Sequence, residues 1–247
     1  MSEKRILLIV SGGIAAYKAL ELVRLLKRQG VAVRAVMTKS AAEFVTPLSM
    51  GVMTEDQVYG DMFDLKEERE IGHIQLSRQA DLVVICPATA NILAKMAAGI
   101  ADDLATTILL ATDKPVLAVP AMNVRMWTHP ATARNLATLA GDGVLTVGPN
   151  QGDMACGEFG PGRMAEPEEI FAAIAVALGG GVLAGKHVLV TSGPTHEPID
   201  PVRYIANRSS GAQGTAIAAA LRDLGARVTF VTGPATVPAP DGVAVVR

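Results

Sequence analysis

The chain has 247 residues, of which half are hydrophobic and only 4% aromatic, and it carries a formal net charge of −2 at pH 7. This length allows one large core, or one domain and part of another, and the abundance of small aliphatic residues favours helices packed on a parallel sheet. The Lys and Arg residues form no basic stripe, which argues against a nucleic-acid partner.

The N-terminus predicts a cytoplasmic protein. Residues 1–5 are polar and charged, and they lead into an apolar run at 6–10 that is too short for the core of a signal peptide or for a membrane span. No membrane partner is therefore expected. The two cysteines, Cys86 and Cys156, are expected to be reduced thiols and not a disulfide.

The chain then alternates between strand and helix patterns. Residues 6–10 predict a buried strand, residues 15–29 a helix that stops at Gly30, and residues 31–37 the next strand. Further strands are expected at 82–86, 116–119 and 144–147, and further helices at 91–98, 131–140 and 167–178. This alternation predicts an α/β fold with a doubly wound, Rossmann-like parallel sheet, whose ligands lie beyond the carboxyl ends of the strands.

Three consecutive glycines at 179–181 interrupt this pattern, and a second cycle of strand, turn and helix begins after Gly185. Its expected elements are a strand at 187–191, a helix at 211–224 and a strand at 227–231. We therefore predict a first domain at residues 1–184 and a partial second Rossmann-like domain at residues 185–247. With about two strands and one full helix, the second domain is expected to be truncated.

The turn after the first strand predicts a phosphate site, because it brings backbone amides and a hydroxyl to a helix N-terminus. Its expected ligand-binding residues are Ser11, Gly12, Gly13, Ile14 and Ala15. The second strand leads into Thr38 and Ser40, where a dinucleotide site would have an acidic residue. A mononucleotide such as FMN therefore fits better than NAD. The alternative is that the glycines only form a tight turn.

Two more strand ends are expected at the same edge of the sheet. Pro87, Ala88, Thr89 and Asn91 follow the strand at 82–86, and both Thr89 and Asn91 can donate hydrogen bonds to phosphate or flavin oxygens. The loop after the strand at 116–119 mixes apolar side chains with one amide, and its expected substrate-binding residues are Ala121, Met122, Asn123 and Met126. Asn123 could bind a substrate carboxylate, or it could be a turn residue that satisfies its own backbone.

The segment at 152–164 has glycines on both sides of Cys156 and no regular periodicity, so it could fold over a ligand. A thiol in such a loop favours a chemical role for Cys156, whereas Cys86 ends a buried strand and is expected only to pack. Within this segment we also expect Ala155, Arg163 and Met164 to bind substrate.

His73 could act as a general base because its imidazole titrates near neutral pH, although a lone histidine is more often an ordinary surface or capping residue. No second histidine or cysteine lies at the spacing of a metal site, so no catalytic metal is expected.

Taken together, several motifs resemble those of the flavin-containing cysteine decarboxylases. They are SGGIAAYK at 11–18, GHI at 72–74, PATAN at 87–91, PAMNVRMW at 120–127 and ACG at 155–157. With TSGPT at 191–195, DPVRYI at 200–205 and NRSSG at 207–211, the whole chain resembles the bacterial bifunctional family that joins phosphopantothenoylcysteine decarboxylase to phosphopantothenate–cysteine ligase in coenzyme A biosynthesis.

The resemblance implies that FMN oxidises the thiol of 4'-phospho-N-pantothenoylcysteine, that the carboxylate is then lost, and that reduction yields 4'-phosphopantetheine. It implies His73 as the base, Asn123 as the residue that holds the substrate carboxylate, and Cys156 as the proton donor. It also implies a homo-oligomer built from trimers and grouped into dodecamers.

For the second domain, the resemblance implies ligation of 4'-phosphopantothenate to cysteine with CTP and Mg²⁺ in a longer chain, with Arg203 and Asn207 at the acyl-cytidylate intermediate. This sequence departs from the family pattern at Ala212, where the family usually has Lys, and at Ile92, where several relatives have Thr. The rival interpretations are a peptidyl-cysteine decarboxylase or flavin prenyltransferase of the same fold, and a non-catalytic FMN-binding regulatory subunit.

Overall fold

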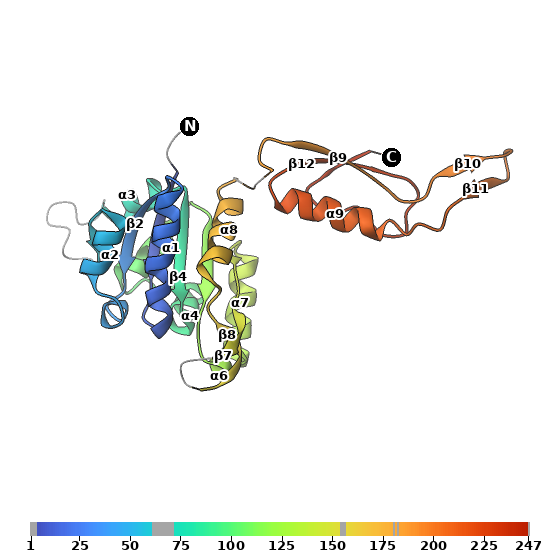
Figure 1. Cartoon of the computed structure of the whole chain (residues 1–247). Helices are drawn as coiled ribbons and strands as arrows, with labels where there is room; N and C mark the ends of the chain where they lie inside the picture. The colour runs from blue at the N-terminus through green and yellow to red at the C-terminus, as the bar shows by residue number, and fades with distance from the viewer. Residues whose placement is uncertain (1–3, 61–71, 154–156, 180, 182, 247) are drawn as a thin grey trace. The chain divides into compact units, whose positions relative to one another are not determined.

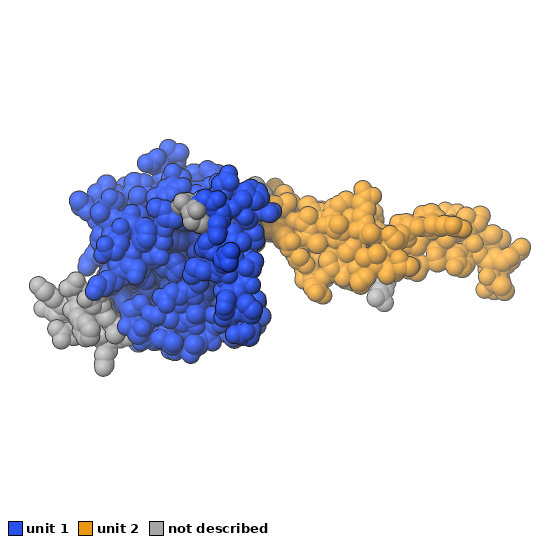
Figure 2. All heavy atoms as spheres, turned by 90° about the horizontal axis from the view of Figure 1, so that it is seen from below, with its two compact units in different colours: residues 1–178 blue, residues 179–247 orange. Residues whose placement is uncertain are grey.

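The computed structural model describes residues 4–60, 72–153, 157–179, 181 and 183–246. The chain forms two compact units, residues 1–178 and 179–247, which Figure 2 distinguishes by colour. No helix within the described residues has the length and apolar character needed to cross a membrane.

The first unit contains a six-stranded sheet in the order β3-β2-β1-β4-β5-β6, in which all neighbouring strands are parallel. Its strands are β1 (Arg5–Val10), β2 (Ala32–Met37), β3 (Val58–Tyr59), β4 (Leu82–Ala88), β5 (Val116–Pro120) and β6 (Leu145–Thr146). From β1 the chain continues through β2 to β3 at one edge of the sheet. It then returns to the other side of β1 and continues through β4 and β5 to β6 at the opposite edge. The predicted doubly wound α/β sheet is therefore confirmed, with the reversal of strand order between β1 and β4.

Helices cover both faces of this sheet (Figure 1). On one face lie α1 (Tyr17–Arg28), α2 (Pro47–Thr54) and α8 (Pro167–Ala177), and on the other lie α3 (Gly72–Arg78), α4 (Ala90–Ala98), α5 (Leu104–Ala111) and α7 (Pro130–Gly141). Strand β1 shows why helices must cover both faces of the sheet. Ile6, Leu8 and Val10 belong to the core under the first group of helices, while Leu7 and Ile9 belong to the core under the second. A strand with apolar residues on both faces is stable only when both are covered.

Several elements of the first unit were not expected from the sequence. Helix α2 begins at Thr46, whose hydroxyl oxygen accepts a hydrogen bond from the backbone N–H of Ser49 at 3.1 Å. Helix α5 begins with a capping box, in which Asp103 Oδ1 accepts from the N–H of Thr106 at 2.8 Å. Helix α3 and the short 3₁₀ helices η1 (Ile14–Ala16) and η2 (Ala41–Glu43) complete the connections, and a short α6 (Val124–Trp127) follows β5.

The glycine-rich segment expected to be irregular contains an antiparallel pair of strands, β7 (Asn150–Asp153) and β8 (Phe159–Arg163). This pair has no recognisable strand pattern, because Gly152, Gly160 and Gly162 stand where alternating side chains would mark a strand.

The second unit has a parallel sheet in the order β13-β12-β9, formed by β9 (His187–Ser192), β12 (Arg227–Thr232) and β13 (Ala244–Val246). Helix α9 (Ala212–Asp223) packs on it through a small core that includes Val190, Ala218 and Phe230. A separate hairpin pairs β10 (His196–Pro198) with β11 (Tyr204–Ala206). The expectation of about two strands in this region was wrong, because β10, β11 and β13 each have only three residues and carry no clear periodicity.

Candidate functional site

A cavity of about 870 Å³ opens in the first unit at the carboxyl ends of β1, β2, β4 and β5. It lies at the point where the strand order reverses, which is the usual ligand site of a doubly wound sheet. The residues expected to bind a cofactor that line it are Ser11, Gly12, Gly13, Ile14, Ala15, Thr38, Ser40, Thr89 and Asn91. Three separate turns therefore contribute to one wall.

Ser11 joins two of these turns. Its side chain is almost fully buried, and its hydroxyl donates to the carbonyl oxygen of Pro87 at 2.7 Å and accepts from the backbone N–H of Thr89 at 3.2 Å. Pro87 and Ala88 are buried residues of β4 that do not line the cavity, and Pro87 instead provides the carbonyl that holds Ser11. The hydroxyl of Ser11 thus has backbone partners and fixes the distance between the turns after β1 and β4.

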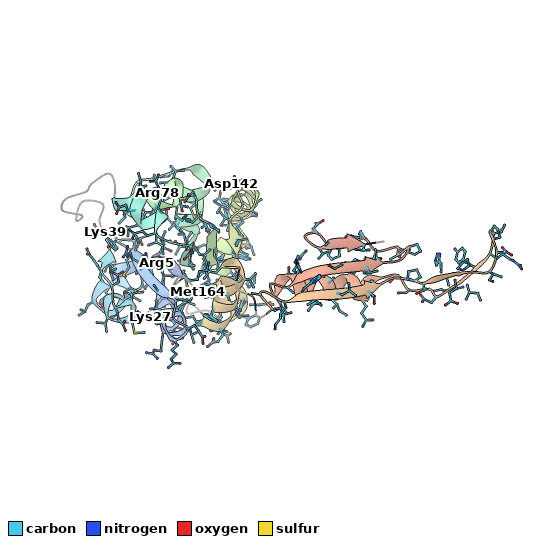
Figure 3. The ribbon with its side chains drawn as sticks, turned by 90° about the horizontal axis from the view of Figure 1, so that it is seen from above. Arg5, Lys27, Lys39, Arg78, Asp142 and Met164 are labelled. Atoms are coloured by element: carbon cyan, nitrogen blue, oxygen red, sulfur yellow. The ribbon has the colours of Figure 1, made fainter. Side chains whose placement is uncertain are left out.

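Gly12 brings the first turn against the loop after β2. A Cβ atom at position 12 would lie 2.3 Å from the Cβ atom of Ser40 and 2.7 Å from its backbone carbon. In the same loop, Thr38 Oγ1 accepts from the backbone N–H of Ala41 at 3.2 Å, which starts η2. Figure 3 labels Lys39, which lies between these residues and also lines the cavity.

The residues expected to bind substrate form another part of the same cavity. Those within the described residues that line it are Ala121, Met122, Asn123, Met126, Arg163 and Met164. The backbone N–H of Met122 donates to the carbonyl oxygen of Gly162 at 3.0 Å, so the loop after β5 is joined to β8. Met164, which follows β8, is labelled in Figure 3.

Asn123 makes the structural contact of a turn residue and a second polar contact within the chain. Its Oδ1 atom accepts from the backbone N–H of Arg125 at 2.7 Å and so caps α6, which is the turn role of an ordinary asparagine. Its Nδ2 atom donates to Oε2 of Glu158. The amide of Asn123 is thus fixed at the cavity wall and already faces a carboxylate.

The remaining expected site residues cannot be placed as side chains. The backbone of His73 belongs to α3, but its side chain lies outside the described residues, as do Ala155 and Cys156. Strand β7 ends at Asp153, which lines the cavity, and β8 begins at Phe159.

Cys86 has the packing role that the sequence predicts. It is fully buried in β4, and its Sγ atom lies 3.8 Å from Sδ of Met164. Burial raises the pKa of this thiol to about 12, although the ammonium of Lys18 partly opposes that effect. Cys86 is therefore a neutral thiol at physiological pH.

Sequence reasoning placed Arg163 at this site but missed the lysines of the cavity wall. Lys18 is one of them and is only 8% exposed. Lys95 is another, and its Nζ atom lies 2.7 Å from Oδ1 of Asp102. The hydrogen bond to Asp102 raises the pKa of Lys95, and the same bond lowers the pKa of Asp102. Lys18 lies one turn after the glycine turn in an amphipathic helix, a position that by itself suggests only a surface lysine. Within the described part of the chain, no cluster of His, Cys, Asp and Glu could hold a metal ion.

Comparison with protein families divides the chain in two. Residues 1–179 match the family model described as Flavoprotein, and residues 183–247 match the model of the DNA/pantothenate metabolism flavoprotein C-terminal domain.

Two curated relatives named coenzyme A biosynthesis bifunctional protein CoaBC are each 50% identical to the chain. The one from Vibrio cholerae aligns over 243 residues, which are 98% of this chain and 61% of the relative. The one from Escherichia coli strain K12 aligns over 242 residues, or 97% and 59%. The chain thus spans about three-fifths of the length of these relatives.

Solved structures resemble the first unit. A PPC decarboxylase mutant in complex with pantothenoylaminoethenethiol is 38% identical with a TM-score of 0.65, and the match covers 70% of this chain and 97% of that one. The FMN binding protein AtHal3 is 39% identical with a TM-score of 0.63, covering 70% and 96%.

Proposed function

The chain belongs to the flavoprotein family, and on that premise we propose that its first unit binds FMN and decarboxylates 4'-phospho-N-pantothenoylcysteine to 4'-phosphopantetheine. The observation that carries this proposal is the single cavity at the β1/β4 reversal, which gathers the expected cofactor residues and the described substrate residues. Support also comes from the similarity to the CoaBC relatives and to the solved PPC decarboxylase.

The residues present fit FMN. The cavity volume lies within the range typical of cofactor sites, roughly 300–1,000 Å³. Gly12 has no side chain where the backbone closely approaches Ser40, and the N–H groups of the Ser11-to-Ala15 turn precede α1, which suits a phosphate. Thr89 and Asn91 would hold other polar atoms of the cofactor from the start of α4. When bound, FMN would supply the two-electron acceptor and donor that the reaction requires.

Three residues of the chain would move or hold protons and charge. His73 would take the proton of the substrate thiol as a general base. The amide of Asn123 would donate to the substrate carboxylate, a contact of the same kind as its hydrogen bond to Glu158. Cys156 would return a proton to the product at the end of the reaction.

Mass spectrometry of the purified protein with phosphopantothenoylcysteine tests the proposal, because loss of carbon dioxide identifies substrate and reaction together. A flavin absorbance band should accompany the protein. A parallel sample with a peptide ending in cysteine distinguishes the peptidyl-cysteine alternative. Flavin binding without decarboxylation of either substrate would indicate a regulatory subunit, and extraction of NAD would refute the cofactor assignment.

The catalytic roles are tested by two variants. Cys156→Ser should release carbon dioxide but accumulate the oxidised enethiol, because a hydroxyl is a much weaker acid than a thiol. His73→Asn should stop the reaction before carbon dioxide is lost. Normal yields of phosphopantetheine from Cys156→Ser would remove this residue from the mechanism.

For the second unit, we propose from the family resemblance that Arg203 and Asn207 contribute to a site for an acyl-cytidylate, which a longer chain would form with CTP and Mg²⁺. The two residues flank β11. Arg203 donates through Nε to Oδ2 of Asp200 at 2.6 Å, and Oδ1 of Asn207 accepts from the N–H of Ser209 at 3.0 Å. We expect pyrophosphate release that depends on CTP and phosphopantothenate only from a longer chain, in which Arg203→Gln should abolish it. Such activity from residues 1–247 alone would contradict the expectation that the second domain is truncated.

On the basis of the family resemblance, we also propose a cytoplasmic homo-oligomer in which trimers assemble into a dodecamer. Large exposed apolar side chains of the first unit are consistent with subunit contacts, among them Ile14, Tyr17, Phe44, Leu48 and Val52. Light scattering of the purified protein measures the oligomer, and a monomer at micromolar concentration would contradict the proposal.

A further inference from the structure

Three charged side chains from three elements meet at one side of the cavity. Lys18 comes from α1, Arg163 ends β8, and Glu166 precedes α8 as its N-cap. The Nζ atom of Lys18 lies 2.9 Å from Oε2 of Glu166, and Nη2 of Arg163 contacts Oε1 of the same carboxylate. Each carboxylate oxygen of Glu166 therefore receives one cation.

The two cations face the ligand space, and their shared acid does not. Lys18 and Arg163 line the cavity, whereas Glu166 is absent from its lining. The carboxylate of Glu169 also acts on both cations, but like Glu166 it does not line the cavity, so at this place the two cations face the ligand space and the two acids lie behind them. An anion is the ligand group that such a wall attracts.

The burial of Lys18 strengthens the electrostatic interactions of this group. The side chain of Lys18 is only 10% exposed, so its charge is weakly screened by solvent and by salt. The hydrogen bond from Lys18 lowers the pKa of Glu166, and the charges of Lys18 and Arg163 lower it further, so the carboxylate stays ionised at neutral pH. Without that carboxylate, two neighbouring cations would repel each other across the cavity wall.

Glu166 is itself held in place. Its backbone N–H donates to Oε2 of Glu169 at 2.8 Å, and the same oxygen accepts from Nδ2 of Asn150 in β7 at 2.6 Å. Gly152, also in β7, leaves room for the Arg163 side chain, since a Cβ atom there would lie 3.1 Å from Nη1. Contacts from β7, β8 and α8 thus fix both Glu166 and the guanidinium that it orients.

We propose that Glu166 is a positioning residue that holds Lys18 and Arg163 as a paired-cation subsite for an anionic group of the substrate. This inference rests on the proposed function, whose substrate carries two such groups, a carboxylate and a phosphate. The carboxylate of Glu166 keeps the two cations together on the wall of the cavity, where both can contact the substrate. FMN would bind through the separate turns around Ser11, Ser40 and Thr89.

The test compares Glu166→Gln with Glu168→Gln, which removes the same charge from the exposed neighbouring turn of α8. A glutamine has only one acceptor oxygen, so it can hold one cation and not both. Glu166→Gln should raise the KM for phosphopantothenoylcysteine by about tenfold, the loss expected for one charge-assisted hydrogen bond, while kcat and the Kd for FMN stay unchanged. Glu168→Gln should change none of these values, and Glu166→Asp should recover part of the loss.

N-pantothenoylcysteine, which lacks the phosphate, distinguishes the two anionic groups. If the subsite receives the phosphate, Glu166→Gln will not alter the KM of this analogue; if it receives the carboxylate, the KM will rise for both substrates. A KM that stays constant or falls for both would overturn the inference, because the mere loss of a negative charge favours an anion.

If Glu166→Gln does not fold, Arg163→Gln is the second variant, since this side chain is 45% exposed and its replacement leaves the Lys18–Glu166 pair intact. It should raise the same KM, and an unchanged KM would equally overturn the inference. If the wild-type protein shows no turnover, calorimetric binding of phosphopantothenoylcysteine replaces KM. Weaker binding to Glu166→Gln would then support the subsite although the proposed reaction had failed.

Discussion

Gly12 and Ser40 approach each other so closely that a methyl group at position 12 would lie 2.3 Å from the Cβ atom of Ser40. The contact joins the turn after β1 to the loop after β2, and two of the nearest atoms belong to the Ser40 backbone. A side chain at this position therefore cannot be accommodated by a change of rotamer.

Gly12→Ala should destabilise the apoprotein by about 1–3 kcal/mol, because the loop after β2 must shift to remove the overlap. The same shift should weaken FMN binding, since Thr38 and Ser40 belong to that loop. Urea denaturation measures the first effect and flavin fluorescence the second.

Gly13→Ala is the matched control for stability. A Cβ atom there would meet Cγ2 of Thr89 at 3.6 Å, which is ordinary van der Waals contact, and the backbone is extended with φ at −174°. If both variants denature at the same urea concentration, the close approach at Gly12 does not constrain the fold.

Ser11→Ala should remove the link between the turns after β1 and β4. The carbonyl oxygen of Pro87 and the N–H of Thr89 would both lose the hydroxyl that they now contact. Because Ser11 is buried, we expect a loss of about 1–3 kcal/mol in the free energy of unfolding. Ser40→Ala alters an exposed hydroxyl and should change stability much less; equal losses would contradict the buried role of Ser11.

The predictable parts of this site are those that local sequence determines. The β1 strand and the turn at Ser11 follow from five consecutive apolar residues and two glycines, and the ends of β4 and β5 could be located in the same way. The carboxyl ends of parallel strands meet at one edge, so the cavity could be expected there.

The charged wall could not be predicted, because it depends on contacts between distant residues. Lys18 and Glu166 are separated by 148 positions, and neither has a pattern that indicates the other. The pairing of β7 with β8 was hidden for a different reason, namely that glycines leave few side chains to alternate. The resemblance to a known family supplied His73, Asn123 and Cys156 as catalytic candidates where periodicity alone left their roles open.

Asn123→Asp should lower kcat/KM by about a hundredfold or more, because it replaces an amide donor by a carboxylate that repels the substrate carboxylate. It would also place a negative charge beside Glu158, the present acceptor of the amide. Decarboxylation rates measured at several substrate concentrations give the change in KM and kcat separately. Glu158→Gln keeps an acceptor for Asn123 and should retain activity; a loss as large as that of Asn123→Asp would assign the essential role to Glu158.

The buried thiol of Cys86 should make stability depend on alkaline pH. Its pKa is raised from 9.0 to about 12 by burial, so the unfolded chain loses this proton at a lower pH than the folded chain. A pKa raised in the folded state gives a stabilisation that is complete below pH 9 and is lost as the pH rises toward 12.

For each pH unit in this interval, the titration of Cys86 should lower the free energy of unfolding by at most about 1.4 kcal/mol. Tyrosines and lysines also titrate in this interval, so two chains must be compared: Cys156→Ser alone and Cys156→Ser with Cys86→Ala. For each chain, urea denaturation at pH 8 and at pH 10 gives the change in the free energy of unfolding, and the difference between these two changes is the contribution of Cys86. The Cys156→Ser chain retains Cys86 as its only thiol, because the sequence has two cysteines. In that chain a thiol reagent should react at pH 8 only after unfolding. Rapid labelling of the folded protein, or identical pH dependence of the two chains, would show that Cys86 is not the buried neutral thiol described above.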